Sequence, residues 1–497
     1  MPSRCRFRVD GLTRVGRRAS AYARHVRYDV AVVGGGTAGC VVAARLSEDP
    51  ARTVCLLEAG PDYGPLAEGR WPADLLDPRG LTFTHDWGVG GEDARSLGAR
   101  VIGGCSTHNA CMAVVGTPAD YDEWGSSWAW AELEPYVERA RTMLHVGPSN
   151  TDDPAPLHAA FLEAAVDLGL PLLDDPDDPA RPTGAGRLPV NIVDATRWNT
   201  ALAYLDPARD RPNLTVLAET PVDCLALDGV RATGVVTVSG DRIDADVVVL
   251  AAGAYLTPAI LLRSGIGPES DLERHGIPVV AALPVGEALL DHHGTGISWR
   301  PTDLLDRLTA EHVRRTGPLF QPHAFVKAAS SGCPPGSWDL HVLTWANAAS
   351  IHDGDEASLI VFNVKPRSAG RVRLGSRDPR DLPVIERGFL RDESDLATVV
   401  EGLELARELA ARPPLARLLG AEVAPGSEML DDYARRTMRN YFHPAGTCGI
   451  GRVVDDSGSV LGVDAIVVAD ASVMPTIPRA NTNLTTVAIA ERLSESI

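Results

Sequence analysis

Lysine, cysteine and long apolar runs are scarce in this chain of 497 residues, where only Lys327 and Lys365 represent lysine. No apolar segment approaches the ~18 consecutive residues that a membrane-spanning helix needs, so we expect a soluble protein without a membrane span. The eight cysteines form no C-x-x-C pair, and we expect neither a disulfide framework nor a metal site. A reducing, cytoplasmic compartment suits this cysteine usage best.

Positive charge is also in the minority. The chain has 47 Lys and Arg against 66 Asp and Glu, a net charge of −19, which disfavours nucleic acid and anionic membranes as partners. Residues 1–27 are the exception, with eight Arg and one Asp. The pair Arg17–Arg18 is not followed by the apolar stretch of an export signal, so we expect a loose basic tail.

A nucleotide-binding unit follows that tail. Tyr28–Val33 is almost entirely apolar, which is typical of a strand buried on both faces. The G-x-G-x-x-G turn Gly34–Gly39 leads from it into a helical segment, Cys40–Leu46, and a second strand follows at Thr53–Leu57. This order of strand, turn, helix and strand predicts a βαβ unit that binds a dinucleotide.

Each conspicuous residue of this unit has a physical role. Gly34 permits the tight turn, Gly36 lets the backbone approach a pyrophosphate, and Gly39 allows the helix to pack closely on the strand. The start of the helix supplies free N–H groups and the positive end of its dipole to the phosphates. Glu58, where the second strand ends, has the spacing of an acceptor for ribose hydroxyls. These residues do not distinguish FAD from NAD.

The rest of the chain predicts further strands and helices. A second glycine-rich turn, Arg100–Asn109, has small residues that would let the backbone lie against a flat ligand. Thr257–Pro258 is expected to open a helix through Leu262, because proline is favoured in a first turn. We expect helices at 132–144, 157–168 and 395–412, and strands at 214–216, 222–227, 233–238, 245–250, 338–345, 359–364 and 371–374. The last three strands predict a separate, antiparallel sheet.

Several segments resemble, in the usual order, those of the glucose–methanol–choline (GMC) family of flavoprotein oxidoreductases. Arg100–Asn109 and Gly253–Pro268 resemble its two signatures, and His443–Cys448, Val468–Pro475 and Asn481–Asn483 resemble its active-site end. The resemblance covers about residues 28–497 and implies FAD rather than NAD. The implied fold combines α/β and α+β: an FAD-binding Rossmann-like domain interleaved with a substrate domain, an antiparallel sheet with helices.

On this basis we expect an FAD-binding domain made of residues 28–125, 186–290 and 441–497. Residues 126–185 and 291–440 would form the substrate-binding domain, with the tail at 1–27 outside both. Neither motif nor composition indicates an oligomeric state.

The resemblance also implies an activity, the oxidation of an alcohol to an aldehyde or ketone by hydride transfer to flavin N5. His443 occupies the family's catalytic position, where a neutral imidazole suits removal of the hydroxyl proton. Asn481 occupies its partner's position, where an amide can hold the substrate oxygen. The electrons would pass to O₂ or another acceptor. The alternatives are a hydroxynitrile-lyase-like protein with a structural flavin and a flavin-binding protein without turnover.

The segment Gly103–Asn109 looks most like choline-oxidase-type members, in which the histidine of this motif is joined covalently to the flavin. The resemblance therefore implies that His108 tethers FAD, with Asn109 as a hydrogen-bond partner; a non-covalent histidine is the alternative. The other cofactor contacts that it implies are Gly34, Gly36, Thr37, Ala38, Gly39, Glu58, Ala59, Val101, Gly104, Thr107, Ala110, Val222, Gly253, Asp470, Ala471, Asn481 and Thr482.

Three departures from the family pattern leave choline itself in doubt as the substrate. Ala288 stands where relatives often have Asn, Ala110 follows the His-Asn pair where Ser can occur, and the body of the chain is short. The cluster Asp291-His292-His293 is similar to a set of metal ligands, but Asp-His is ordinary in this motif of the family. We expect a small-molecule alcohol that the sequence does not name.

Overall fold

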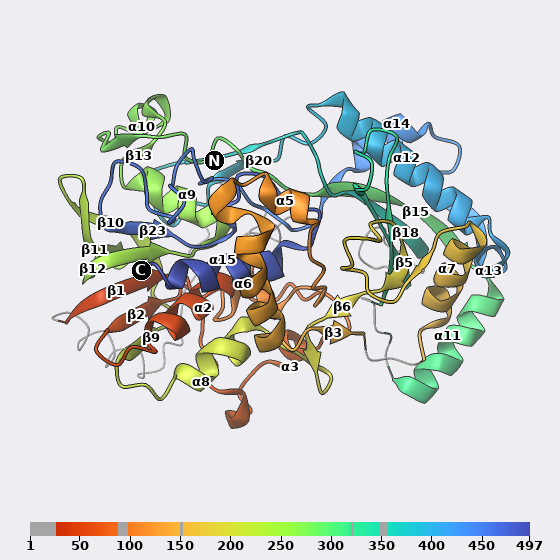
Figure 1. Ribbon diagram of the computed structural model, residues 1–497, viewed down its shortest axis with the longest axis horizontal. Coiled ribbons are helices and arrows are strands. Elements are labelled where there is room, and N and C mark those ends of the chain that lie inside the picture. Colours follow the sequence, from red (N-terminus) through yellow and green to blue (C-terminus); the bar gives the residue numbers. More distant parts are fainter. Residues whose placement is uncertain (1–25, 88–97, 150–152, 318, 320–322, 347–355) are drawn as a thin grey trace, which may run out of the picture.

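Two sheets with their helices form two adjoining halves of the molecule (Figure 1). The computed structural model describes residues 26–87, 98–149, 153–317, 319, 323–346 and 356–497. All but the last two residues of the expected basic tail lie outside these ranges. Within the ranges, no helix has both the length and the apolar character needed to cross a membrane.

The first sheet has the order β10-β11-β12-β1-β2-β9, with β23 paired to β12. Its strands are β1 (Arg27–Val33), β2 (Val54–Leu57), β9 (Leu214–Leu217), β10 (Val222–Asp228), β11 (Arg231–Thr237), β12 (Arg242–Leu250) and β23 (Ile466–Val468). The pairs β1–β12, β1–β2, β2–β9 and β12–β23 are all parallel. Their carboxyl ends therefore meet at one edge, where the turn after β1 lies.

Burial explains why the sequence predicted this sheet well. Val30–Val33 in β1 are at most 3% exposed, as expected of a strand covered on both faces. Helix α2 (Thr37–Leu46) follows the turn and packs against α15 (Thr482–Ser494), which comes from the far end of the chain. The predicted helix start at Cys40 is three residues late, because Gly36 is the N-cap.

The second sheet has the order β21-β15-β18-β17-β16-β5-β4, with β22 paired to β15. Its strands are β4 (Leu172–Leu173), β5 (Gly184–Arg187), β15 (His293–Pro301), β16 (Ala324–Ala328), β17 (Leu340–Ala346), β18 (Ala357–Asn363), β21 (Leu419–Ala424) and β22 (Arg439–Asn440). Except for the parallel pair β4–β5, neighbouring strands are antiparallel. The predicted segment at 371–374 instead forms β19 (Arg371–Arg373), which makes a separate two-stranded sheet with β20 (Val384–Glu386).

The two faces of the second sheet differ. Val342, Leu359 and Val361 belong to a core that also contains residues of α7 and α12, the helices on this face of the sheet. The alternate residues Leu343 and Ile360 belong to a separate core. Because the side chains of a strand point alternately to opposite sides of the sheet, these residues lie on the other face. That face is turned towards the interior of the molecule.

The remaining helices and strands connect these layers. The other helices are α3 (Ala73–Leu76), α5 (Pro118–Asp122), α6 (Trp130–Met143), α7 (Pro156–Asp167), α8 (Asp206–Ala208), α9 (Gly253–Arg263), α10 (Glu269–Arg274), α11 (Asp303–Thr316), α12 (Glu393–Ala410), α13 (Pro413–Ala416) and α14 (Leu430–Thr437). Short strands are β3 (Gly147–Pro148), β6 (Pro189–Val190), β7 (Ile192–Val193), β8 (Thr196–Arg197), β13 (Ile266–Gly267) and β14 (Ala281–Ala282).

Helix α9 corrects one prediction. It begins at Gly253, so Pro258 lies inside the helix and not in its first turn. A proline there has no N–H for the carbonyl of Ala254, one turn earlier. The hydroxyl of Thr447 donates a hydrogen bond of 2.7 Å to that carbonyl and replaces the missing donor. Since this partner lies 193 residues away in the sequence, local reasoning could not find it.

The predicted fold class is confirmed: a sheet with a parallel core lies beside a largely antiparallel sheet covered by helices. Strands of the first sheet come from residues 27–57, 214–250 and 466–468, and those of the second from 172–187, 293–363 and 419–440. The chain thus passes back and forth between the two sheets.

Close packing at Gly39 should be essential to the first sheet. A Cβ atom on Gly39 would lie 1.8 Å from the carbonyl oxygen of Gly34, which is backbone that cannot move aside. We expect Gly39→Ala to lower the free energy of unfolding by about 1–3 kcal/mol, measured by urea denaturation. Gly147→Ala is the matched control, because nothing lies within 4 Å of the added atom. Equal stability of both variants would contradict this assignment.

Candidate active site

A cavity of about 1370 Å³ lies where residues of both sheets meet. Val33 and Leu57, at the ends of β1 and β2, line it from the first sheet, and Leu343 and Phe362 line it from the second. Ligand sites usually measure ~300–1,000 Å³. This cavity therefore has room for an extended cofactor together with a second molecule.

Two helix N-termini point their unpaired N–H groups at this cavity. Gly36 and Asn481 are the N-caps of α2 and α15, and neither helix has a side-chain hydrogen bond at its cap. Gly36, Thr37, Asn481 and Thr482 all line the cavity. Free amide donors at the positive ends of two helix dipoles favour an anion such as a pyrophosphate.

The two glycine-rich turns hold each other in place. The N–H of Gly103 donates a hydrogen bond of 2.7 Å to the carbonyl of Gly35. Gly104 has a φ of +52°, and a Cβ atom there would lie 2.6 Å from the Cα of Gly36. Only glycine allows this approach, which brings both turns to one side of the cavity.

Glu58 lies at the end of β2 in a buried position. Its carboxylate accepts hydrogen bonds from the N–H groups of Gly35 (2.8 Å) and Gly60 (2.7 Å). Burial raises its pKa to about 7, although these two hydrogen bonds act in the opposite direction. The carboxylate lines the cavity and retains acceptor capacity for hydroxyl groups.

Asp470 connects β23 to α9. It accepts hydrogen bonds from the N–H of Gly253 (2.8 Å), the hydroxyl of Thr257 (2.6 Å) and the N–H of Ser472 (2.8 Å). Burial raises its pKa. With both oxygens engaged by the protein, Asp470 positions the cavity wall.

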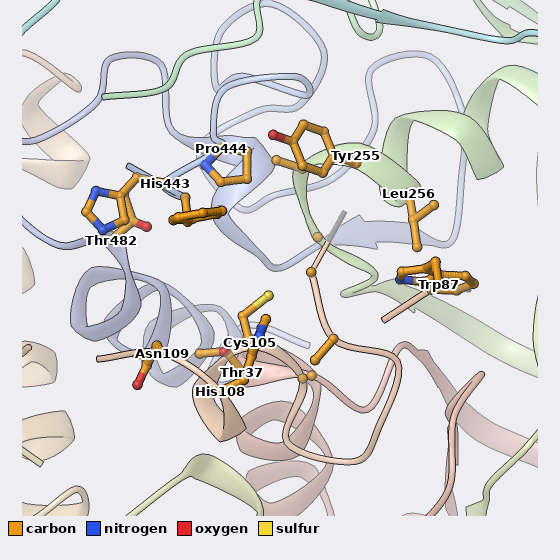
Figure 2. Close-up of a pocket in the computed structure, with 18 of the residues that line it drawn as sticks. Thr37, Trp87, Cys105, His108, Asn109, Tyr255, Leu256, His443, Pro444 and Thr482 are labelled. Atoms are coloured by element: carbon orange, nitrogen blue, oxygen red, sulfur yellow. The ribbon is translucent and has the colours of Figure 1, made fainter. Parts of the chain in front are cut away.

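Most residues predicted from the sequence line this single cavity. They are Gly34, Gly36, Thr37, Ala38, Glu58, Ala59, Gly104, His108, Asn109, Ala110, Val222, Gly253, His443, Asp470, Ala471, Asn481 and Thr482. Figure 2 shows His443 and Thr482 on one side of the cavity and Thr37, Cys105 and His108 on another.

Three predicted contacts do not line the cavity. Gly39 packs against the carbonyl of Gly34 and so supports the first turn from behind. Val101 is fully buried in the core of the first half. The hydroxyl of Thr107 donates to the carbonyl of Gly104 and stabilises the second turn internally. These three residues pack behind the turns, and their contact with a cofactor stays a prediction.

His108 has a defined tautomer. Its Nδ1 lies 3.2 Å from the carbonyl oxygen of Thr82, and because a carbonyl can only accept, Nδ1 carries the proton. Nε2 therefore keeps its lone pair. Burial lowers the pKa of His108 to about 4, so the ring is neutral near pH 7.

His443 is the centre of a buried polar group. Its backbone N–H donates to the carboxylate of Asp291 (2.9 Å), its Nδ1 lies 2.8 Å from Nδ1 of His292, and its Nε2 lies 3.3 Å from the amide nitrogen of Asn481. Burial lowers the pKa of His443 to about 3 and also lowers that of His292. Both imidazoles are therefore neutral near pH 7.

The contact with His292 decides how His443 can react. Two neutral nitrogens at 2.8 Å need one proton between them. If Nδ1 of His443 donates that proton, Nε2 carries the lone pair and accepts a hydrogen bond of 3.3 Å from the amide N–H of Asn481, a long contact that a ligand hydroxyl can replace. The carbonyl oxygen of the Asn481 side chain is buried without a hydrogen-bond partner among the described residues, so a ligand hydroxyl can satisfy it.

His292 is the residue that sequence reasoning missed, since it was considered only as a metal ligand. It lies 151 residues from His443, and no spacing pattern relates the two. They meet because β22 pairs with β15, which places Asn440 opposite His293. Among the described residues, no group of three or more His, Cys, Asp or Glu side chains could hold a metal ion.

These features together define a class of protein, one that binds an extended dinucleotide beside a neutral histidine able to move a proton. Comparison with known proteins gives the family: the chain belongs to the GMC oxidoreductases, whose sequence profiles match residues 28–294 and 366–490.

Three similar proteins illustrate the match. The mitochondrial choline dehydrogenase of Mus musculus is 33% identical, over 97% of this chain and 91% of its own. The choline oxidase of Arthrobacter globiformis is also 33% identical, over 95% and 94%. A crystal structure of pyridoxine 4-oxidase from Mesorbium loti is 28% identical with a TM-score of 0.81, covering 95% of this chain and 99% of that one.

Membership of the family implies FAD, and the residues of the cavity fit that cofactor. Two uncapped helix N-termini suit the pyrophosphate of FAD, and Glu58 suits its ribose hydroxyls. Where Gly104 approaches Gly36, the cavity wall is backbone without side chains, so that a cofactor can lie close to it. The buried, unpartnered oxygen of Asn481 is a further acceptor at the same cavity.

Buried neutral histidines should make the protein acid-sensitive. Burial lowers the pKa to about 3 or 4 for His108, His158, His323, His341 and His443. An unfolded histidine titrates near ~6.5, so stability is lost as the pH falls from that value towards 4. Each histidine can cost up to ~1.4 kcal/mol per pH unit in this interval. We expect the melting temperature to decline between pH 7 and pH 5.

Four carboxyls, those of Glu58, Asp177, Asp291 and Asp470, act in the opposite direction because burial raises their pKa, but the five histidines outnumber them. His158→Leu removes one titrating ring outside the cavity and should make the decline shallower. A melting temperature that stays constant over this range would show that the buried rings do not titrate as described.

Proposed function

We propose that this GMC oxidoreductase oxidises an alcohol to an aldehyde or ketone, with His443 as the acid–base group. One observation carries the proposal: Nε2 of His443 and the amide of Asn481 lie 3.3 Å apart in the cavity that also contains the dinucleotide-binding turns. A hydroxyl bound beside this pair would be next to both a proton acceptor and a hydrogen-bonding amide.

When bound, FAD supplies flavin N5 as the acceptor of the hydride from the carbinol carbon. Nε2 of neutral His443 takes the hydroxyl proton, so that the C–O bond can become a carbonyl. The amide N–H of Asn481 can donate to the substrate oxygen and so orient it, which leaves the hydroxyl hydrogen for Nε2 of His443.

His292 is a positioning residue in this scheme. Its Nδ1 accepts the proton on Nδ1 of His443, which keeps Nε2 of His443 free to act as the base. Asp291 fixes the same segment through the backbone N–H of His443. Burial disfavours a charged imidazole and so keeps His443 neutral, the form that can accept a proton.

The names of the relatives support this chemistry without naming the substrate. Two are named for choline and one for pyridoxine, and both compounds carry hydroxyl groups. The names include both a dehydrogenase and oxidases, so O₂ or another molecule accepts the electrons in our proposal. A hydroxynitrile lyase would use the same histidine without reducing its flavin, and anaerobic bleaching of the flavin by an alcohol separates the two activities.

His443→Ala should retain FAD and lose turnover. Removing a general base costs about 10²–10⁴-fold, so we expect anaerobic flavin reduction to slow by at least ~100-fold in stopped-flow measurements. The matched control is His158→Ala, another buried histidine with a lowered pKa, which does not line the cavity. This control should lose stability but stay within about threefold of wild type. A similarly small effect for His443→Ala would remove it from the mechanism.

We also propose that FAD is attached covalently through Nε2 of His108. Support comes from the hydrogen bond of its Nδ1 to Thr82, which leaves Nε2 with a lone pair on a neutral ring. After acid precipitation, the yellow colour should stay with the wild-type protein and pass to the supernatant for His108→Ala. Colour that leaves the wild-type protein completely would refute the tether and leave the oxidation chemistry untouched.

A further inference from the structure

Tyr441 lies beside His443, and the proposed reaction gives it no role. Its ring centroid is 4.3 Å from that of His443, with the two planes tilted by 42°. On Phe362 it stacks with centroids 3.7 Å apart and an interplanar angle of 2°. The side chain is buried, although Tyr441 is one of the residues that line the cavity. Because neighbouring rings hold its own ring, the position of its hydroxyl is fixed as well.

The hydroxyl of Tyr441 meets polar groups on two sides. On one side it lies 3.3 Å from Nδ1 of His341, a residue of β17, and 4.0 Å from Sδ of Met112. On the other side it meets the side chain of Asn481, because burial raises the pKa of Tyr441 and a hydrogen bond with Asn481 acts in the opposite direction. A hydrogen bond favours a phenolate only when the partner donates, so the amide N–H of Asn481 donates to the Tyr441 oxygen.

The imidazole of His341 has Tyr441 as its one hydrogen-bond partner among the described residues. Its Nε2 is buried without such a partner, and the rings of Phe325 and Trp338 lie with centroids 4.9 and 5.5 Å from its own. Burial lowers the pKa of His341 to about 3, so the ring is neutral near pH 7. Its Nδ1 can therefore accept the hydroxyl hydrogen of Tyr441.

The amide nitrogen of Asn481 has two N–H groups and, among the described residues, two acceptors. One acceptor is Nε2 of His443 at 3.3 Å, and the other is the hydroxyl oxygen of Tyr441. Tyr441 can accept from Asn481 and donate to His341 at the same time, because a hydroxyl does both. The hydrogen bonds thus form one consistent set, in which Asn481 donates to Tyr441 and to His443.

An asparagine amide depends on such partners for its orientation. Its nitrogen and oxygen ends have nearly the same shape, and the surrounding hydrogen bonds decide which end faces which neighbour. If the amide of Asn481 turned over, its carbonyl oxygen would face the lone pair on Nε2 of His443, and no N–H would be directed at a substrate oxygen. Asn481 is the N-cap of α15 but makes no side-chain hydrogen bond there, so the helix does not orient the amide.

We propose that Tyr441 is a positioning residue of the reaction and that it acts through Asn481. Its hydroxyl, which His341 holds in place, accepts one N–H of Asn481. The other N–H is thereby directed at Nε2 of His443 and at the substrate oxygen. This role rests on the proposed function and adds two residues to it. His292 supports His443 from one side, and Tyr441 supports Asn481 from the other.

Tyr441→Phe removes the hydroxyl and keeps the ring that stacks on Phe362. We expect this holoenzyme to retain FAD and to be reduced by an alcohol at least about fivefold more slowly, the loss expected from one hydrogen bond, while the Kd of the alcohol stays within about twofold of wild type. Anaerobic stopped-flow measurements with choline, pyridoxine and benzyl alcohol give both quantities, and the alcohol that bleaches the wild-type flavin fastest is used.

Tyr433→Phe is the matched control. This tyrosine is also buried, and its hydroxyl donates a hydrogen bond of 2.7 Å to the carbonyl of Gly296, but it does not line the cavity. The control should lose stability and be reduced within about twofold of the wild-type rate. A Tyr441→Phe variant that is reduced as fast as this control would overturn the proposal.

A double-mutant cycle tests whether Tyr441 acts through Asn481. Asn481→Ala alone should slow flavin reduction, and adding Tyr441→Phe to it should change the rate by less than about twofold, because the group that the hydroxyl orients is then absent. A hydroxyl with a merely structural role would slow reduction by the same factor in both backgrounds. Equal factors would therefore overturn the proposal even if Tyr441→Phe alone is slow.

The tautomer of His443 can be measured without any substrate. In holoenzyme labelled with ¹⁵N-histidine, the ring signals of His443 are identified by their loss in His443→Ala. We expect the wild-type ring to carry its proton on Nδ1, and the proton to move partly to Nε2 in Tyr441→Phe, because the carbonyl of an overturned Asn481 accepts from Nε2.

The same tautomer in both proteins, or a wild-type proton on Nε2, would overturn the proposal. If no alcohol bleaches the wild-type flavin, the proposed function fails, and the comparison of tautomers still decides whether Tyr441 orients Asn481. The two failures are thus distinguishable.

Discussion

The contact between Nδ1 of His292 and Nδ1 of His443 is the constraint on which the candidate site depends. It joins the residue before β15 to the C-terminal segment of the chain. Because both rings are neutral, one of them must donate its proton to the other in this hydrogen bond. Burial keeps both rings uncharged, because a charged imidazole would lose its hydration there. The contact therefore fixes where His443 lies and engages its Nδ1, so that Nε2 is the nitrogen on the side of Asn481.

Around this contact, the chain assembles the cavity from the ends of regular elements. The carboxyl ends of β1 and β2 and the N-termini of α2 and α15 contribute backbone donors, which suit a phosphorylated cofactor. Asp470 holds the start of α9 against the end of β23, and Thr447 replaces the donor that Pro258 lacks. The backbone donors that suit a cofactor and the side chains that position the cavity wall are thus neighbours in the fold.

The two halves of the cavity differ in their physical character. The half beside the first sheet offers amide donors and a buried carboxylate, whereas the half beside the second sheet offers aromatic rings and aliphatic side chains. The glycines of the turns keep the backbone geometry of one half, whereas the wall of β17 and β18 in the other half is made of side chains.

The sequence by itself determined the first sheet, the glycine-rich turns and His443 with Asn481, because those depend on buried apolar strands and on motifs that are local in the chain. Even there, Gly39, Val101 and Thr107 support the turns and do not line the cavity. Only the tertiary structure decided that His292 contacts His443 and that Arg439 and Phe442 line the cavity. Each of these depends on the pairing of β22 with β15, which brings together residues about 150 positions apart, and no local pattern encodes such a pairing.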